Sequence, residues 1–471
     1  MPASPVQQSP DQQSPDQQST QPQPAPDARM GRGSLAMAWY GLVSAMFFVY
    51  IGAALALAYG TADALIGLAL TIVVYGAVNR ILSAYALRHG LTVHQFSRTL
   101  LGRAGALLAT LIFAATAIYY AVFEGSILAF AFQAQFGGDL ALWSAIVVLY
   151  TTPLVSGGIQ RRLDKVNGFL LPLYWGGLAV AVVWAGTAYG VSGDWLAHTT
   201  AFLPVASGGP GWLACFAAYM GVWIMMMYTM DFAALGRPQD VAFHGRWTFG
   251  WLFYTLAFGL NAVVGIFLTF TIPGLQSTET GVAAGLVTMM GPLGLLLVFV
   301  SQTRINTANY ALGASNLREV AERTLRIRLP RLVWAFITSA IIFALMLLPV
   351  VQYLLVALAW QGALVTGWVG IALTHLALER ATGRGADPAG LPDRRFRSIS
   401  APGVAAWLVS AAVGIGLIES GQPWGATWGA LVTPVLAAAI YAGLRVTSRR
   451  STALIETSAS PEAATTAPAR P

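Results

Sequence analysis

Two charged side chains lie midway along apolar stretches of the chain, where a charge is costly. Glu124 ends the run YYAVFE, and Arg304 lies within the run SQTRINTAN. An ionisable residue inside the hydrocarbon of a membrane usually faces a cavity or a partner and marks a functional site. The opposite signs would also let Glu124 and Arg304 pair directly, which lowers the cost of burying each ion. A purely structural ion pair is the alternative.

The stretch around Arg304 is polar along about two helical turns. Amide and hydroxyl side chains can join transmembrane helices, so helix packing is one interpretation of this stretch. The number of polar groups gathered around an arginine favours a cavity-lining segment instead. Its polar members are Thr303, Arg304, Asn306, Thr307 and Asn309.

Tyr120 precedes Glu124 by one helical turn. Side chains at positions i and i+4 share one face of a helix. An aromatic ring and a carboxylate on the same face can stack a flat heterocycle and accept its N–H groups. The pair therefore predicts a site for a small planar solute rich in N–H donors, such as an aminopyrimidine, a guanine-like purine or a protonated base.

Transmembrane helices are the elements that would hold these residues. The 471-residue chain is 56% hydrophobic and only 10% charged, with a mean hydropathy of +0.64, whereas a soluble domain has about 25% charged residues. A span needs about 20 mostly apolar residues. Twelve stretches fit this requirement, although the fourth and ninth are short and ten or eleven spans is an open alternative. They are 35–58, 64–87, 106–132, 140–157, 166–189, 211–230, 247–270, 291–313, 332–348, 351–377, 401–419 and 424–444.

Basic residues predict the orientation of these spans. With the N-terminus inside, every inside loop contains Lys or Arg, whereas the outside loops contain none and carry Asp63, Asp139, Asp194 and Glu279. Positively charged loops stay in the cytoplasm. We therefore expect a multi-pass protein of the cytoplasmic (inner) membrane with both termini in the cytoplasm. The transmembrane domain would span 34–447, between disordered tails at 1–33 and 448–471, because these tails are polar and lack apolar stretches.

Several other classes of function are disfavoured. The single cysteine, Cys215, allows neither a disulfide framework nor a cysteine zinc site within one chain. The five histidines are scattered, and there is no phosphate-binding glycine loop. A pI of about 9.6 is explained by basic residues at helix ends, so a nucleic acid partner is not expected. We therefore predict no enzymatic activity, no cofactor and no metal.

One motif resembles a known family of transporters. The run GLTVHQFSR begins at Gly90 and is followed by GRAG from Gly102. It is similar to a loop of the nucleobase–cation symporter-1 family of purine and cytosine permeases and hydantoin transporters, although Leu101 stands where phenylalanine is usual. Asp63, the pair Asp231-Phe232 and the segment 306–313 fit in order. The resemblance covers residues 35–445.

The resemblance implies an all-α, five-plus-five inverted-repeat fold, like that of amino-acid/cation symporters. In this fold, spans one and six are broken near mid-membrane, and the substrate lies between them and spans three and eight. Discontinuous helices commonly build such midplane sites. The candidate break points are Gly41 and Gly52 in span one and Gly211 and Gly221 in span six.

The same resemblance implies roles for individual residues. Tyr120 falls at a substrate-stacking position, Glu124 at a ring-binding position and Asn309 at a substrate-binding asparagine. Trp223 is near the stacking aromatic of span six, and Tyr50 matches an aromatic of span one. We place Asn306 with Asn309 among the substrate-binding candidates.

One departure from the family bears on ion coupling. Sodium-coupled members have two neighbouring Ser/Thr hydroxyls in span eight as sodium ligands. Thr303 fits the first, but Arg304 occupies the second. A guanidinium cannot ligate sodium and would take the place of the cation, holding spans one and eight together. Transport would then be coupled to protons or be uncoupled. In the first case Glu124 is the candidate proton carrier, since burial favours its neutral carboxyl and a nearby Arg opposes this effect.

The sequence therefore predicts a secondary transporter that carries a nucleobase or related small N-heterocycle through a lipid bilayer. Two alternatives stay open. One is a non-transporting membrane receptor or sensor of the same fold, and the other is a transporter of a different small solute.

Overall fold

The computed structural model describes residues 29–155, 164–200, 208–276, 278–348, 353–383 and 396–458. Within these ranges the chain is helical, and the one β-type contact is an isolated bridge between Met30 and Gly236. The elements are α1 (Arg32–Tyr40), η3 (Gly41–Ser44), α2 (Met46–Tyr59), α3 (Thr61–His89), α4 (Val93–Phe136), α5 (Leu140–Val155), α6 (Asp164–Tyr189), α7 (Asp194–Ala197), α8 (Gly211–Met220), α9 (Ile224–Ala233), η5 (Pro238–Asp240), α10 (Val241–Phe243), η6 (His244–Thr248), α11 (Trp251–Tyr254), η7 (Thr255–Leu260), α12 (Asn261–Thr271), α13 (Glu279–Met290), α14 (Pro292–Thr324), α15 (Arg331–Met346), α16 (Leu354–Thr382), α17 (Ala401–Ile418) and α18 (Gly425–Ser458).

The apolar stretches predicted from the sequence coincide with helices or helix pairs. In the part of the chain that the structure describes, seven helices are long and apolar enough to cross a membrane, and two bent pairs would bring the number to nine. The remaining predicted spans correspond to the shorter helices α5 and α15 and to α14. Helix α14 is continuous, but the polar run around Arg304 lowers its hydropathy. The sequence did not predict α13, which packs against α4 and α14.

Two spans are broken near their middle, as the family resemblance implied. The helices α1–η3 and α2 meet at a bend of 45°, and α8 and α9 meet at 44°. Gly41 and Gly221 lie at these breaks. At Gly41 an added Cβ would lie 2.3 Å from Nδ2 of Asn167, so a larger residue there would require the Asn167 side chain to move. The other two candidate break points were wrong, because Gly52 lies inside α2 and Gly211 begins α8.

The family-like motif forms the turn from α3 into α4. Gly90 ends α3 in the left-handed region with φ 64°, which glycine adopts without strain. Thr92 then caps α4: its hydroxyl accepts from the Gln95 N–H, and the Gln95 side chain accepts from the Thr92 N–H. This reciprocal capping box satisfies two helix-end donors. The motif therefore fixes where α4 begins.

Gly102 produces a kink inside α4. Its φ is 80°, and an added Cβ would lie 2.7 Å from the Ser400 nitrogen and 2.9 Å from the Arg397 oxygen. The segment before α17 docks here through backbone hydrogen bonds between Arg103 N and Arg397 O, at 3.0 Å, and between Ser400 N and Leu101 O, at 2.9 Å. A glycine is needed at this close approach.

We expect Gly102→Ala to destabilise the protein by about 2 kcal/mol or more, because a left-handed alanine costs about 1–2 kcal/mol and the new methyl group also meets backbone atoms. Thermal unfolding of the purified protein measures the effect. Gly176→Ala is the matched control, since a Cβ at Gly176 meets nothing within 4 Å. An unchanged melting temperature in Gly102→Ala would contradict the assigned strain.

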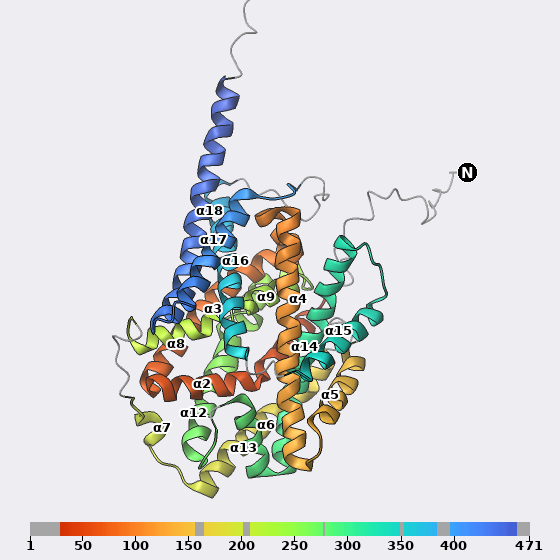
Figure 1. Ribbon diagram of the computed structural model, residues 1–471, viewed down its shortest axis with the longest axis vertical. Coiled ribbons are helices and arrows are strands. Elements are labelled where there is room, and N and C mark those ends of the chain that lie inside the picture. The colour runs from red at the N-terminus through yellow and green to blue at the C-terminus, as the bar shows by residue number, and fades with distance from the viewer. Residues whose placement is uncertain are drawn as a thin grey trace, which may run out of the picture.

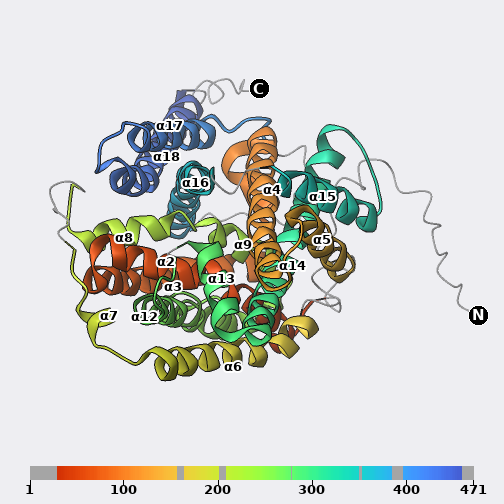
Figure 2. The same ribbon diagram turned by 60° about the horizontal axis from the view of Figure 1, so that its bottom comes forward.

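The helices gather around α4 and α14, which pack against each other. In Figures 1 and 2, α16, α17 and α18 form one group beside α4, while α5 and α15 lie on its other side. Helices α2, α3, α8 and α12 form a further packed group. The break at η3 contacts α14, and α9 contacts α4. Both breaks therefore face the central pair of helices.

Two helices run beyond the predicted boundaries of the transmembrane domain at 34 and 447. Helix α1 begins at Arg32, and the backbone N–H of Met30 donates to the carbonyl of Leu235 at 2.8 Å. Helix α18 continues to Ser458. The parts of the predicted tails (1–33 and 448–471) at 1–28 and 459–471 lie outside the described residues. So do the turn at 349–351 and the basic residues Arg161, Arg162, Arg384, Arg394 and Arg395.

Candidate functional site

A cavity lies where the two broken spans face the central helices. The space between its walls, together with the open solvent at its mouth, amounts to about 500 Å³. Most of its wall is apolar, and its polar members are Tyr120, Glu124, Tyr228 and Asn309. The residues that line it are Leu42, Ala45, Phe47, Phe48, Tyr120, Phe123, Glu124, Val222, Ile224, Met225, Tyr228, Ile305, Asn309 and Leu358.

Glu124 brings a carboxylate to this apolar wall from the middle of α4. The residue is only 4% exposed. Its Oε2 accepts a hydrogen bond from Nε2 of Gln302 at 2.7 Å. An amide N–H that donates to a buried carboxylate makes a charge-assisted bond, which offsets part of the cost of burial. Gln302 thus orients the carboxylate at the cavity wall.

Asn309 adds a hydrogen-bond donor on the opposite helix, α14. The hydroxyl of Tyr228 donates to its Oδ1 at 3.0 Å. In this arrangement Oδ1 of the amide accepts and Nδ2 is its donor. Nδ2 is buried and has no partner among the described residues. Since Asn309 lines the cavity, this unpartnered donor is available to a bound molecule that carries an acceptor.

Tyr120 contributes the face of its ring. Its hydroxyl donates to Oε1 of Gln361 at 3.2 Å, and Nε2 of Gln361 donates to the Gly221 carbonyl at 3.2 Å. The Tyr120 hydroxyl is thus committed to α16, and Gln361 connects Tyr120 to the break between α8 and α9. The aromatic ring beside Glu124 is the surface on which a flat molecule can stack.

Arg304 is fully buried and its guanidinium bridges three segments. Its Nε donates to the Ser44 hydroxyl at 3.1 Å, one terminal nitrogen donates to the Asn167 carbonyl at 2.8 Å, and the other donates to the Tyr40 carbonyl at 2.5 Å. These acceptors belong to the break of span one and to α6. All three acceptors are neutral oxygens. The predicted ion pair with Glu124 is not among the contacts of Arg304.

Further hydrogen bonds join the break of span one to α14. The Ser44 hydroxyl donates to the Ser301 carbonyl at 3.2 Å, and the Ser301 hydroxyl donates to the Ser44 carbonyl. Thr303, predicted as a coupling residue, instead shares a hydrogen bond of 2.9 Å with the Tyr150 hydroxyl on α5. Arg304 therefore lies on a segment that is already held tightly to η3.

Three predicted site residues do not line the cavity. Tyr50 is half-buried and packs edge-on against Phe47, with centroids 6.4 Å apart. Trp223 lies at the break of span six but its ring meets Tyr75, with centroids 6.3 Å apart. Asn306 is buried on α14, and its side chain contacts Gly125 of α4. Their neighbours Phe47, Val222 and Ile305 line the cavity instead.

Several further residues complete the site and were not among the predicted ones. Tyr228, Gln361, Ser44 and Asn167 supply its hydrogen-bonding partners. Gln302 lies in the polar run around Arg304, so its position carried a usable signal. The others are isolated polar residues on different helices, and only the packing of those helices reveals them.

The fold is similar to that of solved transporter structures. No protein-family model matches the chain, and no curated protein sequence matches it. A structure of Mhp1, a nucleobase-cation-symport-1 family transporter, closed with bromovinylhydantoin bound, superposes with a TM-score of 0.69 at 15% identity, covering 91% of this chain and 96% of that chain. Its inward-facing conformation gives 0.65 at 13% identity, covering 90% and 92%.

A more distant similarity connects the chain to a Na⁺-coupled sialic acid symporter. That structure, in a substrate-bound outward-open state, has a TM-score of 0.55 at 13% identity and covers 88% of this chain and 90% of that chain. These similarities confirm the predicted fold class, an all-helical polytopic membrane protein of the five-plus-five type with broken first and sixth spans.

Proposed function

We propose that the chain is a secondary transporter of the nucleobase–cation symporter-1 family, and that it moves a nucleobase or related small N-heterocycle across the cytoplasmic membrane, with both termini in the cytoplasm. The observation that carries this proposal is the cavity at the two helix breaks, with Glu124 on one wall and Asn309 on another. Broken helices that converge at mid-membrane are the usual setting of a transport site.

The polar groups of the cavity favour a particular kind of solute. Glu124 accepts hydrogen bonds from N–H groups, and Nδ2 of Asn309 donates to a carbonyl or ring nitrogen. The face of Tyr120 and the apolar wall around it favour a flat body. A planar ring that carries both N–H donors and an acceptor matches this arrangement, whereas an anion would be repelled by the carboxylate.

The position of Arg304 supports transport without the sodium ion of the related symporters. Its guanidinium donates to two carbonyls and a hydroxyl between span one and span eight, and these are the kinds of oxygen that ligate a hard cation. A fixed positive charge among them leaves no place for sodium. Two transport mechanisms are compatible with this arrangement: proton coupling through Glu124, and facilitated transport without a coupling ion.

Binding measured on the purified protein tests the solute class. A ligand that binds only the folded state stabilises it by about 2.7 kcal/mol at a concentration 100 times its dissociation constant. We expect nucleobases, aminopyrimidines or hydantoins to raise the melting temperature, and sugars and dicarboxylates to leave it unchanged. If no N-heterocycle raised it, the receptor alternative or another solute class would replace this proposal.

Tyr228→Phe should weaken binding of the best heterocycle about fivefold, because the Asn309 amide loses the bond that orients it and one hydrogen bond contributes about 1 kcal/mol. Isothermal titration measures the change. Tyr219→Phe is the matched control, since the Tyr219 hydroxyl is buried, has no partner among the described residues and does not line the cavity. Equal affinities in the two variants would refute the role of Tyr228.

A further inference from the structure

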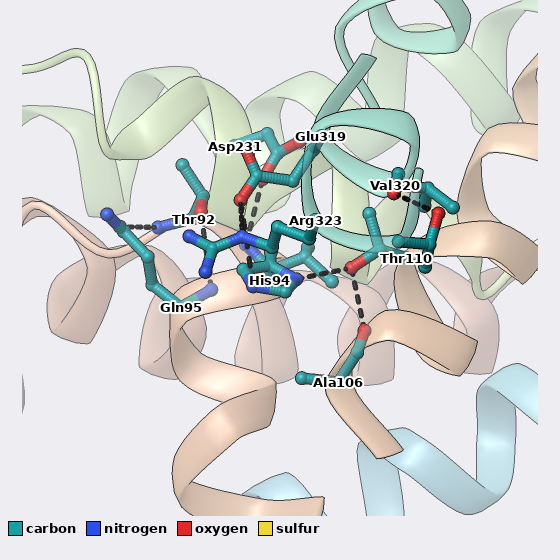
Figure 3. Close-up of polar contacts among 11 residues, drawn as sticks. Thr92, His94, Gln95, Ala106, Thr110, Asp231, Glu319, Val320 and Arg323 are labelled. Atoms are coloured by element: carbon teal, nitrogen blue, oxygen red, sulfur yellow. Dashed lines mark hydrogen bonds and ion pairs between the residues drawn. The ribbon is translucent and has the colours of Figure 1, made fainter. Parts of the chain in front are cut away.

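A second polar cluster lies away from the cavity, where the first turns of α4, the last turn of α9 and the C-terminal turns of α14 meet. Figure 3 shows His94, Thr110, Asp231, Glu319 and Arg323 converging there. The cluster belongs to the motif that begins at Gly90, which the proposed transport site does not use. It contains both acidic and basic groups, and His94 is only 4% exposed.

Asp231 ties the broken span six to the two central helices. Its Oδ1 accepts from the backbone N–H of Val93 at 2.8 Å, and its Oδ2 accepts from Nδ2 of Asn316 at 3.3 Å. Val93 is the first residue of α4, where helix N–H groups and the helix dipole favour a negative charge. The single carboxylate therefore holds the end of α9 to both α4 and α14.

The hydrogen bonds of Thr110 determine the protonation of His94 on one side of the ring. The Thr110 hydroxyl lies 2.7 Å from the Ala106 carbonyl and 2.8 Å from Nδ1 of His94. A hydroxyl has one hydrogen, and a 2.7 Å approach to a carbonyl oxygen requires that this hydrogen lie between them. The hydroxyl must therefore accept from His94, so Nδ1 carries a proton.

The other ring nitrogen faces a carboxylate. Nε2 of His94 lies 3.6 Å from Oε1 of Glu319, and Nε of Arg323 donates to the same oxygen at 2.5 Å. The guanidinium of Arg323 thus holds the Glu319 oxygen that faces Nε2. In a neutral imidazole protonated at Nδ1, Nε2 would point a lone pair at this oxygen. A second proton on Nε2 converts that repulsion into a charge-assisted contact.

His375 differs from His94 in the partners of its two ring nitrogens. Its Nδ1 lies 2.9 Å from the Tyr441 hydroxyl, and its Nε2 lies 3.1 Å from Glu379. Arg445 donates to the Tyr441 oxygen, which leaves the hydroxyl hydrogen for Nδ1. The proton of a neutral ring can then lie on Nε2 and point at Glu379. His94 lacks this option because the Thr110 hydrogen is already used.

Other charged groups around His94 lie on each neighbouring helix and have partners of their own. On α4, Arg98 stacks on the Phe396 ring at 4.6 Å. On α14, Arg318 pairs with Glu322 at 3.4 Å. Asp231 is the acidic group of α9, and His375 faces the cluster from α16 across Phe96, with ring centroids 6.0 Å apart. Glu319, at 3.6 Å, is the carboxylate that faces Nε2 of His94.

We propose that His94 and Glu319 form a proton-binding site, and that the proton held there stabilises the attachment of α9 to α4 and α14 through Asp231. His94 directly follows Val93, whose N–H holds Asp231. Glu319 lies one turn after Asn316, so the two share a face of α14. Loss of the proton places the lone pair of Nε2 opposite the Glu319 carboxylate, and the repulsion separates the two side chains. This separation weakens the bonds of Asp231 to the Val93 N–H and to Asn316. The proton-binding site does not depend on the proposed function. A role of this site in transport does rest on the proposed function.

Nitrogen NMR of ¹⁵N-histidine-labelled protein in lipid bilayers tests the site directly, with the His94 signals identified by their loss in His94→Gln. We expect both ring nitrogens of His94 to be protonated at pH 7, and Glu319→Gln to return the ring to the singly protonated form. His375→Gln is the matched control and should leave the His94 signals unchanged. A singly protonated His94 between pH 5 and pH 7 would overturn the proposal.

Hydrogen exchange of the α4 N-terminus tests the link to α9, with rates corrected for the pH dependence of amide chemistry. The Val93 region should lose about tenfold or more of its protection when His94 loses its proton, since a bond to a charged group contributes about 1.5–3 kcal/mol. His94→Gln should show the low protection at every pH, and pH-dependent protection in this variant would refute the link. Neither measurement requires transport. If both results were as expected but the protein transported no heterocycle, only the proposed function would be refuted.

Discussion

Arg304→Ala should abolish transport and lower the stability of the protein by about 3 kcal/mol or more. The substitution removes the donor shared by the Tyr40 and Asn167 carbonyls and the Ser44 hydroxyl. A buried acceptor left without its partner costs about 1–3 kcal/mol, and the vacated volume adds a cavity cost. The break of span one would also lose its bridge to α14 and α6, which positions Leu42 and Ala45 at the cavity.

Sodium offers a sharper readout of the same variant. Removal of the guanidinium leaves two carbonyls and a hydroxyl around a vacant position, which suits a hard cation. We therefore expect sodium chloride, compared with choline chloride, to raise the melting temperature of Arg304→Ala and to leave that of the wild type unchanged. Arg304→Lys is the control, because it keeps the positive charge but not the planar fork that reaches several acceptors. Equal sodium effects in wild type and Arg304→Ala would contradict the assigned role.

Glu124→Gln should weaken binding of the transported heterocycle about 10- to 100-fold. The side chain keeps its shape, but the amide has one acceptor instead of a carboxylate, and a hydrogen bond to a charged group contributes about 1.5–3 kcal/mol. The variant should also lose any response of uptake to a proton gradient, since an amide does not titrate. Isothermal titration and uptake into proteoliposomes measure the two effects.

Two further variants separate charge from position. Glu124→Asp keeps the carboxylate but withdraws it from Gln302 and from the cavity, so its affinity should lie between those of the wild type and Glu124→Gln. Glu419→Gln removes a carboxylate that accepts from the indole N–H of Trp360 and does not line the cavity, and should bind like the wild type. Unchanged affinity and solute preference in Glu124→Gln would show that Glu124 does not contact the solute.

Charge at membrane depth was the most informative signal in the sequence. It identified Glu124 and Arg304, and both lie buried on the central helices that face the helix breaks. Their partners could not be predicted, because depth along a helix does not fix the direction of a side chain. Gln302 lies two residues before Arg304 and therefore points to another side of α14, where it meets Glu124.

The presence of breaks in spans one and six was predicted correctly, whereas their positions were predicted only in part. Each broken span contains two glycines, and glycine propensity alone cannot choose between them. Crowding does not choose between them either, because an added Cβ would lie 2.4 Å from Ala262 at Gly52 and 2.4 Å from Asp63 at Gly211, as close as the 2.3 Å approach to Asn167 at Gly41. Trp223 and Tyr50 were assigned to the site by their place in the family pattern. Their rings pack against Tyr75 and Phe47, and their neighbours Val222 and Phe47 line the cavity.

Uptake of labelled nucleobases, aminopyrimidines and hydantoins into proteoliposomes, under an imposed sodium or proton gradient, tests the central claim most directly. We predict uptake of at least one N-heterocycle that is independent of sodium, either follows the proton gradient or needs no gradient, and falls in Glu124→Gln. Uptake driven by sodium with Arg304 intact would contradict the role of the guanidinium, and no uptake of any heterocycle by folded protein would contradict the account as a whole.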